Sequence, residues 1–94
     1  LRIFNDSAGI MNKSIIDNKL EILLVSQFTL YADCKKGNRP SYMKAMPPQQ
    51  AKTLYASFVS QFKETYSHVE DGEFGANMKV ELVNDGPVTI ILEN

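Results

Sequence analysis

Residues 20–31, LEILLVSQFTLY, decide the expected fold because they are rich in branched and aromatic side chains and show no helical period. Turn-forming residues bound the stretch on both sides, so we predict that it forms a buried strand at the centre of the domain. Residues 1–4, apolar around Arg2, are expected to end an element. Residues 5–9 are expected to turn, and residues 12–19 to form a polar connector with space for a brief strand.

Downstream of this strand, the sequence predicts a loop followed by a helix. Gly37, Asn38 and Pro40 favour turns and place a loop at residues 32–41. From Pro47 onward, apolar residues recur at the spacing of one helical face, which predicts an amphipathic helix with prolines in its first turn. The residues on this face are Ala51, Leu54, Tyr55, Phe58, Val59 and Phe62.

The C-terminal part predicts two further strands around a turn. Residues 78–82 alternate apolar and charged side chains, and residues 88–92 are rich in β-branched residues. The sequence NDGP at 84–87 signals a turn, but its proline lacks the backbone N–H that a tight hairpin uses and permits a cis peptide bond. The expected fold class is α/β, with a mixed β-sheet packed against an amphipathic helix in a single domain over residues 1–94.

The composition indicates a folded, soluble protein. Of the 94 residues, 44% are apolar and 22% are charged, which argues against a disordered chain. No apolar run approaches the ~20 residues that span a bilayer, and no leader opens the sequence, so a cytoplasmic protein is expected. The one cysteine, Cys34, allows neither an internal disulfide nor a zinc cluster. It is either an incidental loop residue or a thiol activated by Lys35 and Lys36. No metal or cofactor is expected.

Charge is unevenly distributed along the chain. Residues 34–63, here called the basic segment, contain six basic and no acidic residues, whereas residues 64–94 contain seven acidic residues and one lysine. A stretch of one sign can neutralise phosphates and attract a polyanion. The alternative interpretation is a solvated surface whose lysines pair with the acidic C-terminal part. The candidate RNA-binding residues are Lys35, Lys36, Arg39, Lys44 and Lys52.

The sequence is poorly suited to most familiar enzyme mechanisms. The one histidine, His68, lies in a polar stretch before Glu70 and Asp71, which favours a surface histidine over the base of a Ser-His-Asp triad. A glycine-rich phosphate loop is also absent from the sequence. Two polar interruptions of apolar segments stand out instead, at residues 26–29 and 84–89. Either one alone is compatible with a strand end whose polar groups bond to nearby backbone.

The two interruptions together resemble the signatures of the D-aminoacyl-tRNA deacylase, or D-tyrosyl-tRNA(Tyr) deacylase, family. The family motif SQxT is present as SQFT at 26–29, and NxGPxT is present as NDGPVT at 84–89. They occur in the family's order, with a basic KKGNRPSY loop, the amphipathic helix and an FGANM segment between them. The resemblance runs from Leu1 to about residue 92 and implies a mixed α/β fold that dimerises through its sheets. It also implies an additional N-terminal segment with an arginine that braces the Gly-Pro turn, so we expect this sequence to be short at its N-terminus.

The resemblance implies hydrolysis of the ester bond in D-aminoacyl-tRNA, and in mischarged glycyl-tRNA, as chiral proofreading in translation. Ser26, Gln27 and the backbone N–H of Phe28 would line the site of the ester carbonyl, and Thr29 would lie beside the ester. Thr29 is a candidate nucleophile, but no base lies near it in the sequence. This favours a second route, in which the vicinal ribose hydroxyl of the terminal adenosine helps to activate water.

The resemblance also implies how the wrong stereoisomer is recognised. Gly86 and Pro87 would enter the pocket of a partner subunit in cis form, and their carbonyls would hold the substrate's amino group. An L side chain would then meet backbone and be excluded. The remaining selectivity candidates are near this motif in the sequence, and the two apolar ones are equally compatible with the core. They are Asn84, Thr89 and the apolar Phe74 and Met78.

Two other functions are compatible with the sequence. In the first, the chain is a non-catalytic RNA-binding module in which the basic segment contacts phosphates and the strand motifs only pack. In the second, it is an inactive fragment of the fold. Release of a D-amino acid from charged tRNA would distinguish an esterase from these two alternatives, because neither an RNA-binding module nor an inactive fragment would hydrolyse the ester.

Overall fold

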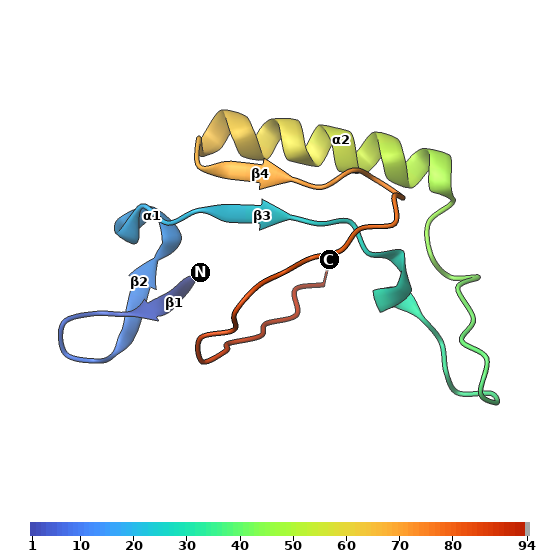
Figure 1. The fold of residues 1–94 in the computed structure, drawn as a ribbon, viewed down its shortest axis with the longest axis horizontal. Helices are drawn as coiled ribbons and strands as arrows, with labels where there is room; N and C mark the ends of the chain where they lie inside the picture. The colour runs from blue at the N-terminus through green and yellow to red at the C-terminus, as the bar shows by residue number, and fades with distance from the viewer. Residues whose placement is uncertain (94) are drawn as a thin grey trace. The chain divides into compact units, whose positions relative to one another are not determined.

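The computed structural model describes residues 1–93 and contains both helices and paired strands (Figure 1). By their internal contacts, these residues form two compact units, one of residues 1–20 with 78–93 and one of Glu21–Asn77. One strand pair is antiparallel and the other parallel, and one long helix is present. The predicted α/β class is confirmed, while the single domain over residues 1–94 stays a prediction.

The larger unit is built on a parallel strand pair with a helical crossover. Strand β3 (Ile22–Leu24) pairs with β4 (Val69–Asp71), with Leu24 opposite Asp71. Parallel neighbours require a long connection, which here includes the 3-10 helix η1 (Phe28–Tyr31) and helix α2 (Pro48–Thr65). Figure 1 shows α2 running alongside β4. The end of β3, η1 and α2 therefore all belong to the larger unit.

Helix α2 confirms the predicted amphipathic helix. Pro47 precedes it and Pro48 is its first residue, a position where a missing N–H leaves no helical hydrogen bond unmade. Val59 of α2 and Val69 of β4 are only 8% and 6% exposed. Because α2 also contacts β4, the core of the larger unit lies where these two elements meet.

The smaller unit begins with an antiparallel hairpin followed by one helical turn. Strand β1 (Arg2–Asn5) pairs with β2 (Met11–Ser14). The short helix α1 (Ile15–Asn18) starts directly after β2 with a capping box, in which Ser14 and Asp17 each bond to the other's backbone N–H. The predicted turn at residues 5–9 and the brief strand within residues 12–19 are therefore both confirmed.

The turn between β1 and β2 is organised by the Asp6 carboxylate. One oxygen, Oδ1, accepts hydrogen bonds from the backbone N–H groups of Ala8 at 2.9 Å and Ile10 at 3.0 Å. The hydrogen bond from Ile10 is the largest cause that lowers the pKa of Asp6 below its ordinary value of 3.8. Gly9, with φ +77°, supplies the left-handed conformation that the turn requires.

We expect Asp6→Ala to lower the melting temperature at neutral pH, because two turn amides lose their acceptor. A depressed folded-state pKa means that Asp6 stabilises the fold above pH 3.8 and that this contribution is lost as the pH falls through the folded-state pKa. The difference in melting temperature between wild type and variant should therefore shrink in acid. Thermal unfolding followed by circular dichroism measures it, and a difference that is constant from about pH 7 to about pH 2 would contradict this role.

Three predicted strands differ in the structure. Within residues 20–31, only Ile22–Leu24 is a strand, and the chain then turns into η1. The backbone N–H of Leu30 bonds to the Gln27 carbonyl at 3.4 Å, so this part of the apolar run meets its hydrogen bonds locally. Residues 78–82 and 88–92 form no strand, and in the described range 1–93 they make no backbone hydrogen bond with a second strand. Their strand-like pattern lacks the pairing that a strand requires.

None of the helices formed by residues 1–93 has the length and apolar content needed to cross a membrane.

Candidate active site

Residues 26–29, here called the ester segment, follow the end of β3 in the larger unit. Ser26 is half-buried, and Phe28 opens η1, which also contains Thr29. The Gln27 side-chain amide donates a hydrogen bond to the Thr29 hydroxyl. Three of the four predicted catalytic side chains are thus polar groups grouped within one bend of the chain.

Within residues 1–93, the Thr29 side chain forms no hydrogen bond to a general base. Its hydroxyl is bonded to the Gln27 amide, and an amide nitrogen cannot take up a proton at neutral pH. His68 instead contacts the ring of Tyr66, beyond the C-terminal end of α2, with ring centroids 5.5 Å apart. A hydroxyl without a base is a weak nucleophile, so this geometry favours a role for Thr29 in positioning.

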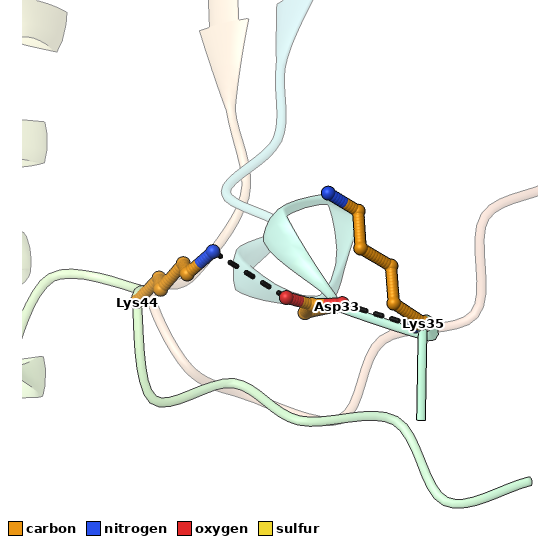
Figure 2. Close-up of polar contacts among 3 residues, drawn as sticks. All are labelled: Asp33, Lys35 and Lys44. Atoms are coloured by element: carbon orange, nitrogen blue, oxygen red, sulfur yellow. Dashed lines mark hydrogen bonds and ion pairs between the residues drawn. The ribbon is translucent and has the colours of Figure 1, made fainter. Parts of the chain in front are cut away.

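The Asp33 carboxylate, just after η1, organises the start of the basic segment. Figure 2 shows Asp33 between two lysines: its Oδ1 accepts from the backbone N–H of Lys35 at 3.0 Å, and its Oδ2 lies 3.4 Å from Nζ of Lys44. Asp33 also exchanges two backbone hydrogen bonds with Ser41, at 2.8 and 3.0 Å. These contacts close the predicted loop at residues 32–41, which begins shortly after the ester segment in the sequence.

The candidate RNA-binding residues differ in their pairing. Lys44 is paired with Asp33. Lys35, Lys36, Arg39 and Lys52 are exposed, and none of them forms an ion pair within residues 1–93. A pairing of the basic segment with the acidic C-terminal part occurs at Lys63, which bonds to Asp71. Pairing with the acidic C-terminal part, the alternative to RNA binding, therefore accounts for Lys63. The four unpaired cations are available to a polyanion.

Aromatic contacts connect the ester segment to the loop that follows it. The rings of Phe28 and Tyr42 meet edge to face, with centroids 5.2 Å apart and planes at 69°. Such pairs add about 0.5–1.5 kcal/mol beyond the area that they bury. Tyr42 comes directly after the Asp33–Ser41 bridge, so the loop and the ester segment are held to each other.

A shallow groove of about 510 Å³ runs between α2 and the chain that leaves β4. Tyr55 and Phe74 form its aromatic part, with ring centroids 5.7 Å apart, and Lys52 is among its lining residues. The Lys63–Asp71 ion pair lies in the same groove and raises the pKa of Lys63 through its hydrogen bond. Phe74 is half-buried here, which fits a pocket wall and a core position equally.

The second motif lies in the other compact unit. The peptide bond between Gly86 and Pro87 is cis, as predicted, and Gly86 has φ +108°. Asn84 and Thr89 on either side are exposed, and Met78 is half-buried. The ester segment and residues 84–89 thus each have their own defined local geometry.

A cluster of three or more metal-binding side chains does not occur among the residues that the structure describes. The groups that the candidate site offers are hydroxyls, amides, backbone groups and cations.

Comparison with known proteins identifies the family. The sequence model of the D-Tyr-tRNA(Tyr) deacylase family matches residues 1–93. The chain belongs to this family. The resemblance carried by the two motifs is thereby confirmed.

Relatives of this chain support the family assignment along its whole length. It is 56% identical over 94 residues to the D-aminoacyl-tRNA deacylase of Shouchella clausii and 57% identical to that of Thermosipho africanus. It spans 64% and 63% of the length of these two relatives. Among solved structures it is similar to the c-Myc DNA Unwinding Element Binding Protein, with a TM-score of 0.89 and 49% identity, covering all of this chain and 64% of that one.

Sequence reasoning did not place two residues, Asp33 and Tyr55, at the site. Asp33 could have been found from the sequence, because an aspartate two residues before a turn amide often accepts its hydrogen bond. Tyr55 of α2 was predicted as part of the apolar face, yet its hydroxyl donates to the Leu24 carbonyl at 3.0 Å. Nothing in the spacing of residues 24 and 55 indicates that contact, because it depends on how α2 lies against β3.

Proposed function

We propose that this protein hydrolyses the ester bond of D-aminoacyl-tRNA, and of mischarged glycyl-tRNA, releasing the amino acid and tRNA as a proofreading step in the cytoplasm. The observation that carries the proposal is the family match over residues 1–93, which contain both motifs. Relatives over 50% identical along all 94 residues are named D-aminoacyl-tRNA deacylases. The polar chemistry of the ester segment suits this reaction, because an aminoacyl ester is already activated and needs mainly positioning and oxyanion stabilisation.

In the proposed mechanism, the ester segment holds the reacting carbonyl. Ser26, Gln27 and the Phe28 N–H line the site where negative charge develops, and Thr29 lies beside the ester. Water attacks the carbonyl with the help of the vicinal ribose hydroxyl, which passes the proton on. The Gln27–Thr29 hydrogen bond supports this route, because the Thr29 oxygen accepts it and the Gln27 amide cannot act as a base for the Thr29 hydroxyl.

In the proposed selectivity mechanism, two copies of the chain form a homodimer with each active site at the subunit interface. The carbonyls of Gly86 and Pro87 enter the partner's site and hold the substrate's amino group, and Asn84 and Thr89 support the turn. With the amino group and ester both held, an L side chain points into backbone. Phe74 and Met78 are the two apolar candidates for selectivity. Exclusion by backbone separates stereoisomers more strongly than one added apolar contact.

Hydrolysis is tested by incubating the protein with D-tyrosyl-tRNA and separating free D-tyrosine from intact tRNA. The proposal predicts catalytic release of D-tyrosine. Binding of charged tRNA without release would instead identify an RNA-binding module, and neither binding nor release would identify an inactive fragment.

Binding of tRNA is proposed to depend on the unpaired cations of the basic segment. The triple variant Lys35→Ala, Lys36→Ala, Arg39→Ala should weaken binding and flatten its salt dependence. The slope should fall by roughly 0.7–0.9 of a log unit for each phosphate that the variant no longer neutralises. Fluorescence anisotropy with labelled tRNA over a series of salt concentrations measures the slope.

Two variants serve as controls for this binding prediction. The double variant Lys13→Ala, Lys79→Ala removes exposed charges outside the basic segment and should leave the slope unchanged. Lys44→Ala should have a smaller effect than removal of an unpaired cation, because Asp33 already partly neutralises Lys44. An unchanged slope in the triple variant would exclude these residues as phosphate contacts.

A further inference from the structure

The Leu24 carbonyl is the point at which three elements of the larger unit meet. It accepts a hydrogen bond from the Tyr55 hydroxyl of α2 at 3.0 Å and one from the backbone N–H of Gly72, just after β4, at 2.9 Å. A carbonyl oxygen has two lone pairs, and both are used here. The direction of the Leu24 peptide is therefore set by α2 and by the end of β4 together.

Leu24 is the last residue of β3 and lies two residues before Ser26. The strand hydrogen bonds end at this position, and Val25 and Ser26 continue outside the strand. A rotation of the Leu24 peptide would therefore change the orientation of the ester segment, which begins two residues later. The two bonds to its carbonyl oppose that rotation.

Tyr55 is itself held in place. Its ring packs on Phe74 at 5.7 Å between centroids, and its side chain is half-buried. Partial burial, and then the charge of Asp71, raise the pKa of Tyr55 above its ordinary value of 10.0. The phenol therefore stays protonated and able to donate throughout the physiological pH range.

We propose that Tyr55 is a positioning residue for the ester segment, acting through the Leu24 carbonyl. The inference rests on the proposed deacylase function and adds a residue of helix α2 to the catalytic arrangement. Misplacement of a reacting group by about 1 Å costs up to roughly 100-fold in rate. A hydroxyl that fixes the entry to residues 26–29 thus affects turnover without touching the substrate.

The test compares Tyr55→Phe with Thr65→Val. The first removes the bond to Leu24 and keeps the ring on Phe74. The second removes a hydroxyl bond within the same helix, from Thr65 to the Gln61 carbonyl at 2.9 Å. We expect Tyr55→Phe to lower kcat for D-tyrosyl-tRNA by about 10-fold with KM within about 2-fold of wild type. Thr65→Val should leave both constants within about 2-fold.

Amide NMR signals of residues 26–29 provide a second measurement that does not need activity. They should shift or broaden in Tyr55→Phe and stay unchanged in Thr65→Val. If kcat and these signals in Tyr55→Phe match those of Thr65→Val, the positioning role is wrong. If the wild-type protein does not hydrolyse the substrate, the proposed function fails, and the NMR comparison alone decides whether Tyr55 positions the segment.

Discussion

Removal of the free ribose hydroxyl next to the ester of D-tyrosyl-tRNA is expected to slow hydrolysis by roughly 10³-fold, within the range for loss of a general acid–base group. The hydroxyl of Thr29 is already bonded to Gln27 and has no base within the ester segment. Thr29→Ala should therefore cost less, no more than about 100-fold, as expected when a group that only positions the substrate is removed. Single-turnover rates with ribose and deoxyribose termini, for wild type and variant, measure both effects.

RNA-assisted hydrolysis and a Thr29 nucleophile predict opposite orders for the rate losses caused by Thr29→Ala and by removal of the ribose hydroxyl. A Thr29 nucleophile would make Thr29→Ala the more damaging change and would form an acyl-enzyme that mass spectrometry detects. Thr53→Ala provides a matched control, because the Thr53 hydroxyl bonds to the Gln49 carbonyl of its own helix, at 3.2 Å. Its hydrolysis rate should equal that of wild type. An acyl adduct on Thr29 would overturn the RNA-assisted mechanism.

Gly86→Ala is expected to reduce discrimination between D- and L-aminoacyl-tRNA. Gly86 has φ +108°, a conformation that alanine adopts only with strain of about 1–3 kcal/mol. The nearest atom to an added Cβ, the Val88 nitrogen, is 3.7 Å away, so the cost comes from the backbone and not from a clash. Relaxation of that strain should move the turn and lower the ratio of D to L hydrolysis rates by about 5- to 150-fold.

Gly9→Ala is the matched control for this change. Gly9 also has a positive φ, +77°, and an added Cβ would meet nothing within 4 Å. It lies in the turn between β1 and β2, so the same kind of strain is introduced outside the motif. Gly9→Ala should lower the melting temperature while leaving the D to L ratio at the wild-type value. Equal ratios in Gly86→Ala and wild type would exclude the turn from selectivity.

Helix α2 was predictable because its signals are local. Prolines at its start and apolar residues along one face act through a few residues of chain. The ester segment was predicted as part of a strand for a comparable reason, since its apolar neighbours share the composition of β3. β3 ends at Leu24, opposite Asp71, where its partner β4 also ends. That pairing joins residues far apart in the sequence and could not be found from the pattern at 20–31.

The site shows the same division between local and distant effects. The motif residues at 26–29 and 84–89 were found from the sequence through their resemblance to the two signatures of the family. The contact of Tyr55 with Leu24 joins residues 31 positions apart, and the pairing of Lys44 with Asp33 distinguishes one cation from its neighbours. Such contacts follow from the packing of elements, so they required the structure.

The proposed function requires that the protein hydrolyses D-aminoacyl-tRNA and spares L-aminoacyl-tRNA. It is tested most directly by measuring hydrolysis of D-tyrosyl-tRNA and L-tyrosyl-tRNA, prepared on the same tRNA, at equal protein concentration. We expect the D ester to be hydrolysed more than about 200-fold faster than the L ester, beyond the discrimination that an apolar pocket alone provides. Equal rates for the two esters, or no release above the spontaneous rate, would contradict it.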